Sequence, residues 1–233
     1  RTSINADGGN VRDRTTGNTS QNFSQEVVQE FQISTANFDL STGITSVGSI
    51  NIVTRSGAQD YHGAGYFYFR DHNMAAYRAL RRSAFNPDPF FARRSSGFWL
   101  GGPLKKDRLF FFFNLEHMNQ DSVGTVQPNA ASLSSLALIA PSPYTTHQIS
   151  NRFDYTVSPR HSLFLRYTLD KNRGNGPIGA PTMPSNWLVN SNWSDQSILG
   201  VTSILRPTLV NDFRFSYSWW KNRNLYPTTA ECG

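Results

Sequence analysis

The clearest pattern in the chain is the alternation of side-chain type between residues 108 and 116. One parity is wholly apolar, with Leu109, Phe111, Phe113 and Leu115. Successive side chains of a strand point to opposite faces, so the pattern predicts a β-strand whose two faces meet different environments. The other parity mixes apolar with polar residues, and its polar members are Arg108, Asn114 and Glu116.

The same alternation returns at 151–157, 163–170 and 213–220. Segments 61–70, 95–102 and 197–205 also have strand character, so we expect about seven strands in this part of the chain. The additional residues on the apolar parity are Phe153, Tyr155, Val157, Leu163, Leu165, Tyr167, Leu169, Phe213, Phe215, Tyr217 and Trp219. The additional polar residues on the other parity are Arg152, Asp154, Arg166, Asp170 and Arg214.

The connections between these segments alternate between short and long. "PLKK", "SPR" and "RPT" are short turns, whereas 71–93, 119–147 and 172–193 are long. Outer-membrane barrels have short periplasmic turns, long extracellular loops, and strands that are apolar toward lipid and polar toward the lumen. A strand over 107–117, at roughly 3.3 Å per residue and a tilt of about 40°, covers about 27 Å, close to an apolar band of about 25 Å. We therefore expect the apolar parity to face lipid and the other to face the lumen.

Three alternatives remain open from the pattern. A soluble β-sandwich has alternating strands as well, and a secreted carbohydrate-binding β-domain would use Trp187, Trp193, Trp219 and Trp220 as stacking platforms. The 13% aromatic content and the loop asymmetry favour the membrane barrel. A passive or structural barrel, for adhesion or secretion, fits the same pattern.

Residues 1–60 differ in kind from the rest. They are rich in Asn, Ser, Thr, Gly and Gln, and the only strand patterns are short ones at 28–35 and 49–55. We interpret 1–60 as the end of a separate unit and 61–233 as the strand-rich domain.

Composition adds mainly exclusions. The formal charge of +6 is spread along the chain, so we expect no nucleic-acid partner. Cys232 is the single cysteine, and neither a metal-ligand cluster nor a catalytic motif is present, so we expect no cofactor, no metal and no enzyme activity. "GNGPIG" at 174–179 matches a dinucleotide fingerprint in letters, but its proline excludes the helix that this motif requires.

The first long connection contains the only candidate ligand-binding set. Guanidinium groups match phosphate geometry, so these arginines are weak candidates for an anionic ligand or lipopolysaccharide phosphates, the alternative being a solvated loop. The set is Arg78, Arg81, Arg82, Arg93 and Arg94. In the second long connection, 130–140 is compatible with a short amphipathic helix.

Residues 28–63 resemble the junction between plug and barrel in TonB-dependent outer-membrane transporters. "INIVTRSG" is similar to the last plug strand of these transporters. "LGGPLKKDRLFFFFNLE" at 100–116 is similar to the early barrel hairpin of their Oar-like branch. Members of this branch usually carry a carboxypeptidase-regulatory-like domain ahead of the plug. Val47-Gly48-Ser49 departs from the paired glycines frequent in the family. The junction residues are Ile50, Asn51, Ile52, Val53, Thr54, Arg55, Ser56 and Gly57.

The resemblance implies a fragment with the end of a plug and the first strands of a barrel of about 22 strands. It further implies the bacterial outer membrane as location, and uptake of a scarce, unidentified ligand powered by the TonB complex. Outer-membrane lipid and lipopolysaccharide are the other expected partners. The TonB box of such proteins precedes the plug and is not in this sequence, so energy coupling is implied by the resemblance alone.

The face assignment predicts unequal costs for two arginine substitutions in the complete protein. Phe111→Arg should cost about 2–4 kcal/mol of folding free energy if this position faces the middle of the bilayer, whereas Asn114→Arg on the lumen side should cost little. Reversible folding into lipid vesicles measures both, and equal costs would contradict the assignment of the faces.

Overall fold

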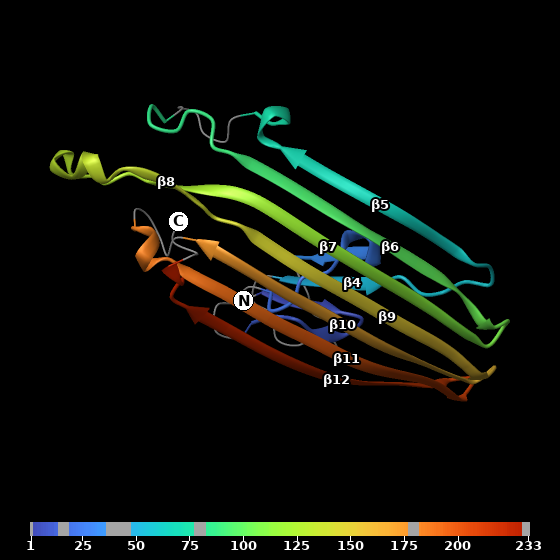
Figure 1. Cartoon of the computed structure of the whole chain (residues 1–233). Coiled ribbons are helices and arrows are strands. Elements are labelled where there is room, and N and C mark those ends of the chain that lie inside the picture. Colours follow the sequence, from blue (N-terminus) through green and yellow to red (C-terminus); the bar gives the residue numbers. More distant parts are fainter. Residues whose placement is uncertain (1, 14–18, 36–47, 77–82, 177–181, 230–233) are drawn as a thin grey trace.

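The computed structural model describes residues 2–13, 19–35, 48–76, 83–176 and 182–229. These residues form two β-sheets, joined by turns and a few short 3-10 helices (Figure 1). Within these ranges, no helix has both the length and the apolar character to span a membrane. The chain is all-β, as its alternation predicted.

The N-terminal sheet has four strands in the order β2-β1-β4-β3. The strands are β1 (Thr2–Ala6), β2 (Gly9–Asn10), β3 (Val28–Ser34) and β4 (Gly48–Thr54). The sheet is mixed because β1 pairs with β4 in parallel while β3 pairs with β4 antiparallel. Asp7 and Gly8 form the β1–β2 turn with φ of 47° and 88°, as a two-residue hairpin with two left-handed residues requires. The two short strands expected near 28–35 and 49–55 are confirmed.

The second sheet is antiparallel, with the order β12-β11-β10-β9-β7-β6-β5 and with β8 beside the end of β7. Each long strand on this path is hydrogen-bonded to the long strands that come before and after it in the sequence. This is the up-and-down topology of an unclosed barrel wall. The strands are β5 (His62–Asp71), β6 (Phe91–Lys105), β7 (Leu109–Val126), β8 (Leu138–Pro141), β9 (Tyr144–Ser158), β10 (His161–Gly176), β11 (Leu188–Arg206) and β12 (Leu209–Leu225).

The strands are longer than the sequence indicated. The expected loop 119–147 includes the end of β7, all of β8 and the start of β9, and the expected loop 172–193 includes the end of β10 and the start of β11. Polar residues continue these ladders because strand pairing uses backbone groups, whatever the side chain. A 3-10 helix at Ala131–Leu136 lies within the segment expected to be helical. The fingerprint-like glycines 174 and 176 end β10, and the remainder of that motif lies outside the described residues.

The register joins the apolar parities of neighbouring strands into continuous rows. Phe111 lies opposite Phe153, which lies opposite Leu165. The row continues through Leu199 to Phe215, and its residues at Phe153, Leu165 and Phe215 are 41%, 46% and 57% exposed. A contiguous apolar face of this kind, left uncovered, requires an apolar environment. This face is the outward face, and the opposite face is the inner face.

The N-terminal sheet lies against the inner face of the large sheet, behind its middle strands in Figure 1. The chain then passes from β4 to β5 along that face. At Gly57 a Cβ atom would lie 2.4 Å from the Phe111 carbonyl oxygen and 2.8 Å from that of Gly102. Only glycine allows the backbone to come this close to the sheet.

Gly57→Ala should therefore separate the connecting segment from the sheet. We expect a loss of about 1–3 kcal/mol in the free energy of unfolding of the complete protein, as for other overpacked positions. Denaturant titration measures this loss, and exposed Ser56→Ala is the matched control, expected within about 0.5 kcal/mol of the wild type. Equal stability of both variants would contradict the close approach.

Candidate functional site

Arg166 lies at the interface of the two sheets with its side chain fully buried. Its Nη1 atom donates to Asp7 Oδ2 over 3.0 Å, and its Nη2 atom donates to Gln196. Arg152 Nη1 reaches Asp7 Oδ1 at 3.4 Å. One carboxylate from the N-terminal sheet thus lies between two guanidinium groups of β9 and β10.

Thr54 completes the surroundings of the Asp7 carboxylate. Its backbone N–H donates to Asp7 Oδ1 over 3.0 Å and its hydroxyl to Asp7 Oδ2 over 2.6 Å. Arg152 is also held by Asp154, to which its Nε and Nη2 atoms donate over 2.9–3.1 Å. These contacts compensate part of the loss of hydration that burial imposes on the charges. We call Asp7, Thr54, Arg152 and Arg166 the ion cluster.

A second set of contacts joins the segment after β2 to β10 and β11. The backbone N–H and the side-chain amide of Asn22 each donate to Asp170 Oδ2 over 3.0 Å. Gln21 Nε2 donates to the carbonyl oxygens of Thr168, over 3.0 Å, and Ser194, over 3.3 Å. This segment therefore bonds to the wall largely through neutral amides.

A third set lies near η1, the 3-10 helix Gln25–Val27. Ser24 Oγ donates to Glu116 Oε2 over 2.6 Å, and the Tyr66 hydroxyl donates to the same oxygen over 3.0 Å. Arg55, in the junction segment, lies over the ring of Trp99 at 5.2 Å and within 3.8 Å of Glu26. With Arg214 of β12, which donates to the Asp7 carbonyl oxygen, the inner face of the wall contacts the N-terminal unit from β5 to β12.

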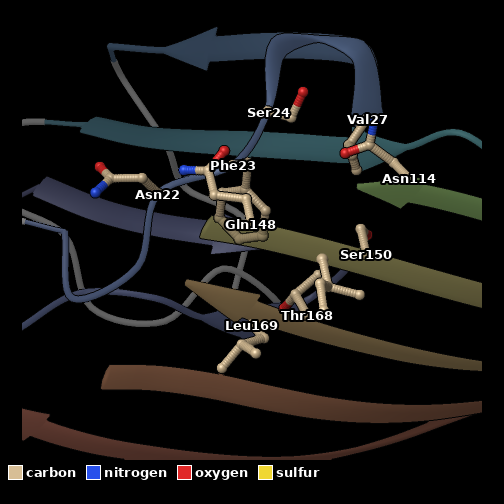
Figure 2. Close-up of a pocket in the computed structure, with 10 residues that line it drawn as sticks. Asn22, Phe23, Ser24, Val27, Asn114, Gln148, Ser150, Thr168 and Leu169 are labelled. Atoms are coloured by element: carbon tan, nitrogen blue, oxygen red, sulfur yellow. The ribbon is translucent and has the colours of Figure 1, made fainter. Parts of the chain in front are cut away.

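A cavity of about 10 Å³ remains between the two sheets, lined by Phe23, Val27, Asn114, Ser150 and Thr168 among others (Figure 2). This volume corresponds to about one water molecule. Asn114 is fully buried, and its Nδ2 atom donates to the Tyr66 hydroxyl over 3.0 Å. The expectation that Asn114→Arg costs little is therefore wrong, because the docked N-terminal unit occupies the space that an arginine would need.

A larger groove of about 430 Å³ lies at the loop ends of β7, β9, β10, β11 and β12. Tyr144 and Gly174 are cross-strand neighbours there, and a Cβ atom on Gly174 would lie 2.8 Å from Tyr144 Cδ2. The remaining lining is neutral and mostly polar. It consists of Gln120, Ser122, Ser142, Pro143, Asn175, Gly176, Leu188, Asn190 and Asn224.

The structure brings most of the predicted lumen-facing residues to the inner face. Asn114, Glu116, Arg152, Arg166 and Asp170 lie at the interface of the two sheets. Arg214 donates from Nη1 to the Asp7 carbonyl oxygen over 3.3 Å, and Asp154 pairs with Arg152. Arg108 is different, because it lies exposed in the turn between β6 and β7.

The predicted lipid-facing residues lie in register with one another. Leu109 pairs with Tyr155, which pairs with Leu163, one row away from the row of Phe111. Their exposure to lipid in the assembled protein stays a prediction. Trp187, one of the proposed carbohydrate platforms, is only 1% exposed and packs against Val126 and Ala140, so it cannot stack on a ligand.

The candidate ligand-binding arginines do not form one site. Arg78, Arg81 and Arg82 lie outside the described residues. Arg93 and Arg94 lie in β6, not in a loop as expected. Arg93 donates to Gln120 Oε1 from Nε over 3.0 Å and from Nη2 over 2.6 Å, and Arg94 lies 3.7 Å from Asp121.

Sequence reasoning missed the residues that the N-terminal unit contributes. Asp7, Gln21, Asn22 and Ser24 are single polar residues in a polar region, without periodicity or a motif. Thr54 belongs to the predicted junction, but its bond to Asp7 has no local signal. Contacts between residues so distant along the chain become visible only when the sheets are docked.

The ion cluster predicts a large stability difference between two aspartate substitutions. Asp7→Ala leaves two buried guanidinium groups without their shared carboxylate and should cost about 3–5 kcal/mol. Asp121→Ala breaks an exposed pair with Arg94 and should cost at most about 1 kcal/mol. Denaturant unfolding of the complete protein in detergent measures both, and similar losses would show that the ion cluster does not hold the unit.

Comparison with known proteins identifies the family. A family model described as an outer membrane beta barrel domain matches residues 53–133 and 125–231. A search of curated proteins gives no match.

Among solved structures, the chain resembles siderophore receptors. The ferric enterobactin receptor mutant Q482A from Pseudomonas aeruginosa, in complex with enterobactin, superimposes with a TM-score of 0.66 at 11% identity over 100% of this chain and 36% of the receptor. The siderophore receptor PirA from Acinetobacter baumannii gives 0.63 at 15% identity over 99% and 34%. PirA from Pseudomonas aeruginosa gives 0.60 at 14% over 97% and 34%. The chain thus spans about a third of the length of these receptors and has their fold.

The wall topology, its polar inner face and its apolar outward face agree with the family match, which covers well over half of the chain. This chain belongs to the outer membrane beta barrel domain family and is located in the bacterial outer membrane.

Proposed function

We propose that this chain is a segment of a TonB-dependent receptor that takes up a scarce ligand across the outer membrane. In this proposal residues 1–60 are the C-terminal part of the plug and residues 61–233 the first part of the barrel, with the connections within 71–93, 119–147 and 172–193 outside the cell. The observation that carries the proposal is the docking of the N-terminal sheet on the polar inner face of the wall through the ion cluster.

The chemistry of the interface suits a plug that can be displaced. Many of its contacts are hydrogen bonds and ion pairs, which water can replace when the surfaces separate. A neutral hydrogen bond then contributes only about 0.5–1.5 kcal/mol net, and one to a charged group about 1.5–3 kcal/mol. An apolar interface of the same size would resist entry of water. A passive barrel has no need for such a seal, because its lumen conducts solutes without rearrangement.

The ligand is proposed to enter from the loop ends, where the groove beside Tyr144 offers amide and hydroxyl groups. The similar solved structures are siderophore receptors, one of them in complex with enterobactin. An iron-siderophore complex is therefore the first ligand to test. Membership in the Oar-like branch rests on the residues at 100–116 and is part of the proposal.

Energy coupling can be tested without knowing the ligand. Ser24→Cys places a thiol at the docked interface, where the serine is 3% exposed, in a background with Cys232→Ser. We expect this thiol to react with a membrane-impermeant maleimide in energised cells with an intact TonB complex, and to stay protected in cells that lack TonB. The measurement is the fraction labelled in the complete protein.

Thr208→Cys, in the exposed β11–β12 turn, is the matched control and should label equally in both strains. Both thiols are labelled in cells in which only the outer membrane is permeabilised, so that the reagent reaches the periplasm while the inner membrane stays energised. Equal labelling of Ser24→Cys with and without TonB would overturn energy coupling and favour the passive barrel.

A further inference from the structure

Four cationic side chains gather on the outward face of β10 and β12. The antiparallel register aligns Lys171 with Trp193 and Trp193 with Lys221 in one row. The next row toward the loops aligns Arg173 with Ser191 and Ser191 with Arg223. All four cations are exposed, and we call Lys171, Arg173, Lys221 and Arg223 the cationic belt.

These four residues share the parity of the apolar outward face. Lys171 and Arg173 follow Leu165, Tyr167 and Leu169 on β10. On β12, Lys221 and Arg223 follow Phe213, Phe215, Tyr217 and Trp219 in the same alternation. Successive rows are about 7 Å apart along a strand. The belt therefore begins one row beyond the row of Leu169, Asp195 and Trp219, on the same surface.

Aromatic and polar groups around the belt fit a membrane interface. Lys171 Nζ lies 5.5 Å from the centre of the Trp193 ring, and Trp193 Nε1 donates to Asp195 Oδ2 over 3.3 Å. Asp195 lies in the adjacent row, opposite Leu169 of β10 and Trp219 of β12. Toward β7 the same row continues with His147 and His117, whose ring centres are 4.4 Å apart. Tryptophan is enriched where the hydrocarbon meets the headgroups.

We propose that the cationic belt binds the phosphate groups of lipopolysaccharide in the outer leaflet. A surface on which cations follow apolar and aromatic rows matches a lipid whose acyl chains lie beside its phosphates. Two of the four cations are arginines, which can bind phosphate through two parallel hydrogen bonds. The choice of leaflet rests on the proposed orientation of the receptor, with the longer connections outside the cell.

The test compares lipid binding by the complete protein and by a charge-neutralised variant. The variant carries Lys171→Gln, Arg173→Gln, Lys221→Gln and Arg223→Gln. The probes are lipid A with both phosphates, the same lipid A after removal of its phosphates, and phosphatidylglycerol, each titrated in detergent and followed by native mass spectrometry. We expect the variant to bind bisphosphorylated lipid A at least about tenfold more weakly, since each surface cation contributes to anionic-lipid binding.

The matched control removes the same number of charges from the turn end of the wall, with Lys106→Gln, Arg108→Gln, Arg160→Gln and Arg206→Gln, all at exposed positions. It should keep the affinity of the wild type within about twofold. Heat-modifiable migration checks folding, and the pairs K171Q/R173Q and K221Q/R223Q replace the fourfold variant if that variant does not fold.

Two further results would overturn the inference. One is an equal loss in the belt variant and the control, which would indicate net charge alone. The other is that the wild type binds phosphatidylglycerol or dephosphorylated lipid A as tightly as it binds bisphosphorylated lipid A. Either result leaves the proposed transport intact if the Ser24→Cys thiol still reacts in a TonB-dependent manner, so the two proposals fail separately.

Discussion

The pairing of backbone groups in the long antiparallel ladder is the constraint on which the rest of this structure depends. In hydrocarbon an unpaired N–H or C=O group costs several kcal/mol, so a wall of strands is stable there only where each strand has neighbours on both sides. Strands β6, β7, β9, β10 and β11 meet this condition within the chain. The outer edges of β5 and β12 have no strand partner among the described residues, so in a closed barrel further strands must cover both edges.

Because the ladder is formed by backbone groups, the side chains determine the chemical character of the two faces. The outward face is apolar over several rows and then becomes cationic, which matches the change from acyl chains to headgroups. The inner face carries charges that would be costly in hydrocarbon, and the N-terminal unit compensates many of them. The three charged members of the ion cluster illustrate the balance, since Asp7 without Arg152 and Arg166, or the arginines without Asp7, would leave buried charge without a partner.

The contacts between the two sheets fix the position of the N-terminal unit, and separating the sheets costs only a modest free energy. Buried ion pairs and hydrogen bonds fix where the N-terminal unit lies, because each depends on the distance and direction between its donor and acceptor. They contribute less net stability than an apolar interface of equal area, because both surfaces are well hydrated when apart. The absence of a ligand-sized space at the cavity lined by Asn114 and Thr168 fits a closed seal at that point of the described interface.

The sequence by itself determined the strand positions and their faces. A two-residue period is a local property, so Phe111, Phe153 and Leu165 could be assigned to one face before their register was known, and the glycine at position 57 and the strand before it could be assigned to a junction. Tertiary structure decided how far the strands extend, because polar residues after position 118 pair through the backbone with no apolar signal. It also decided that Asn114 and Trp187 are buried and that Asp7 meets Arg166, a partner 159 residues away. Such contacts depend on how two sheets dock, and no segment of the chain encodes that arrangement locally.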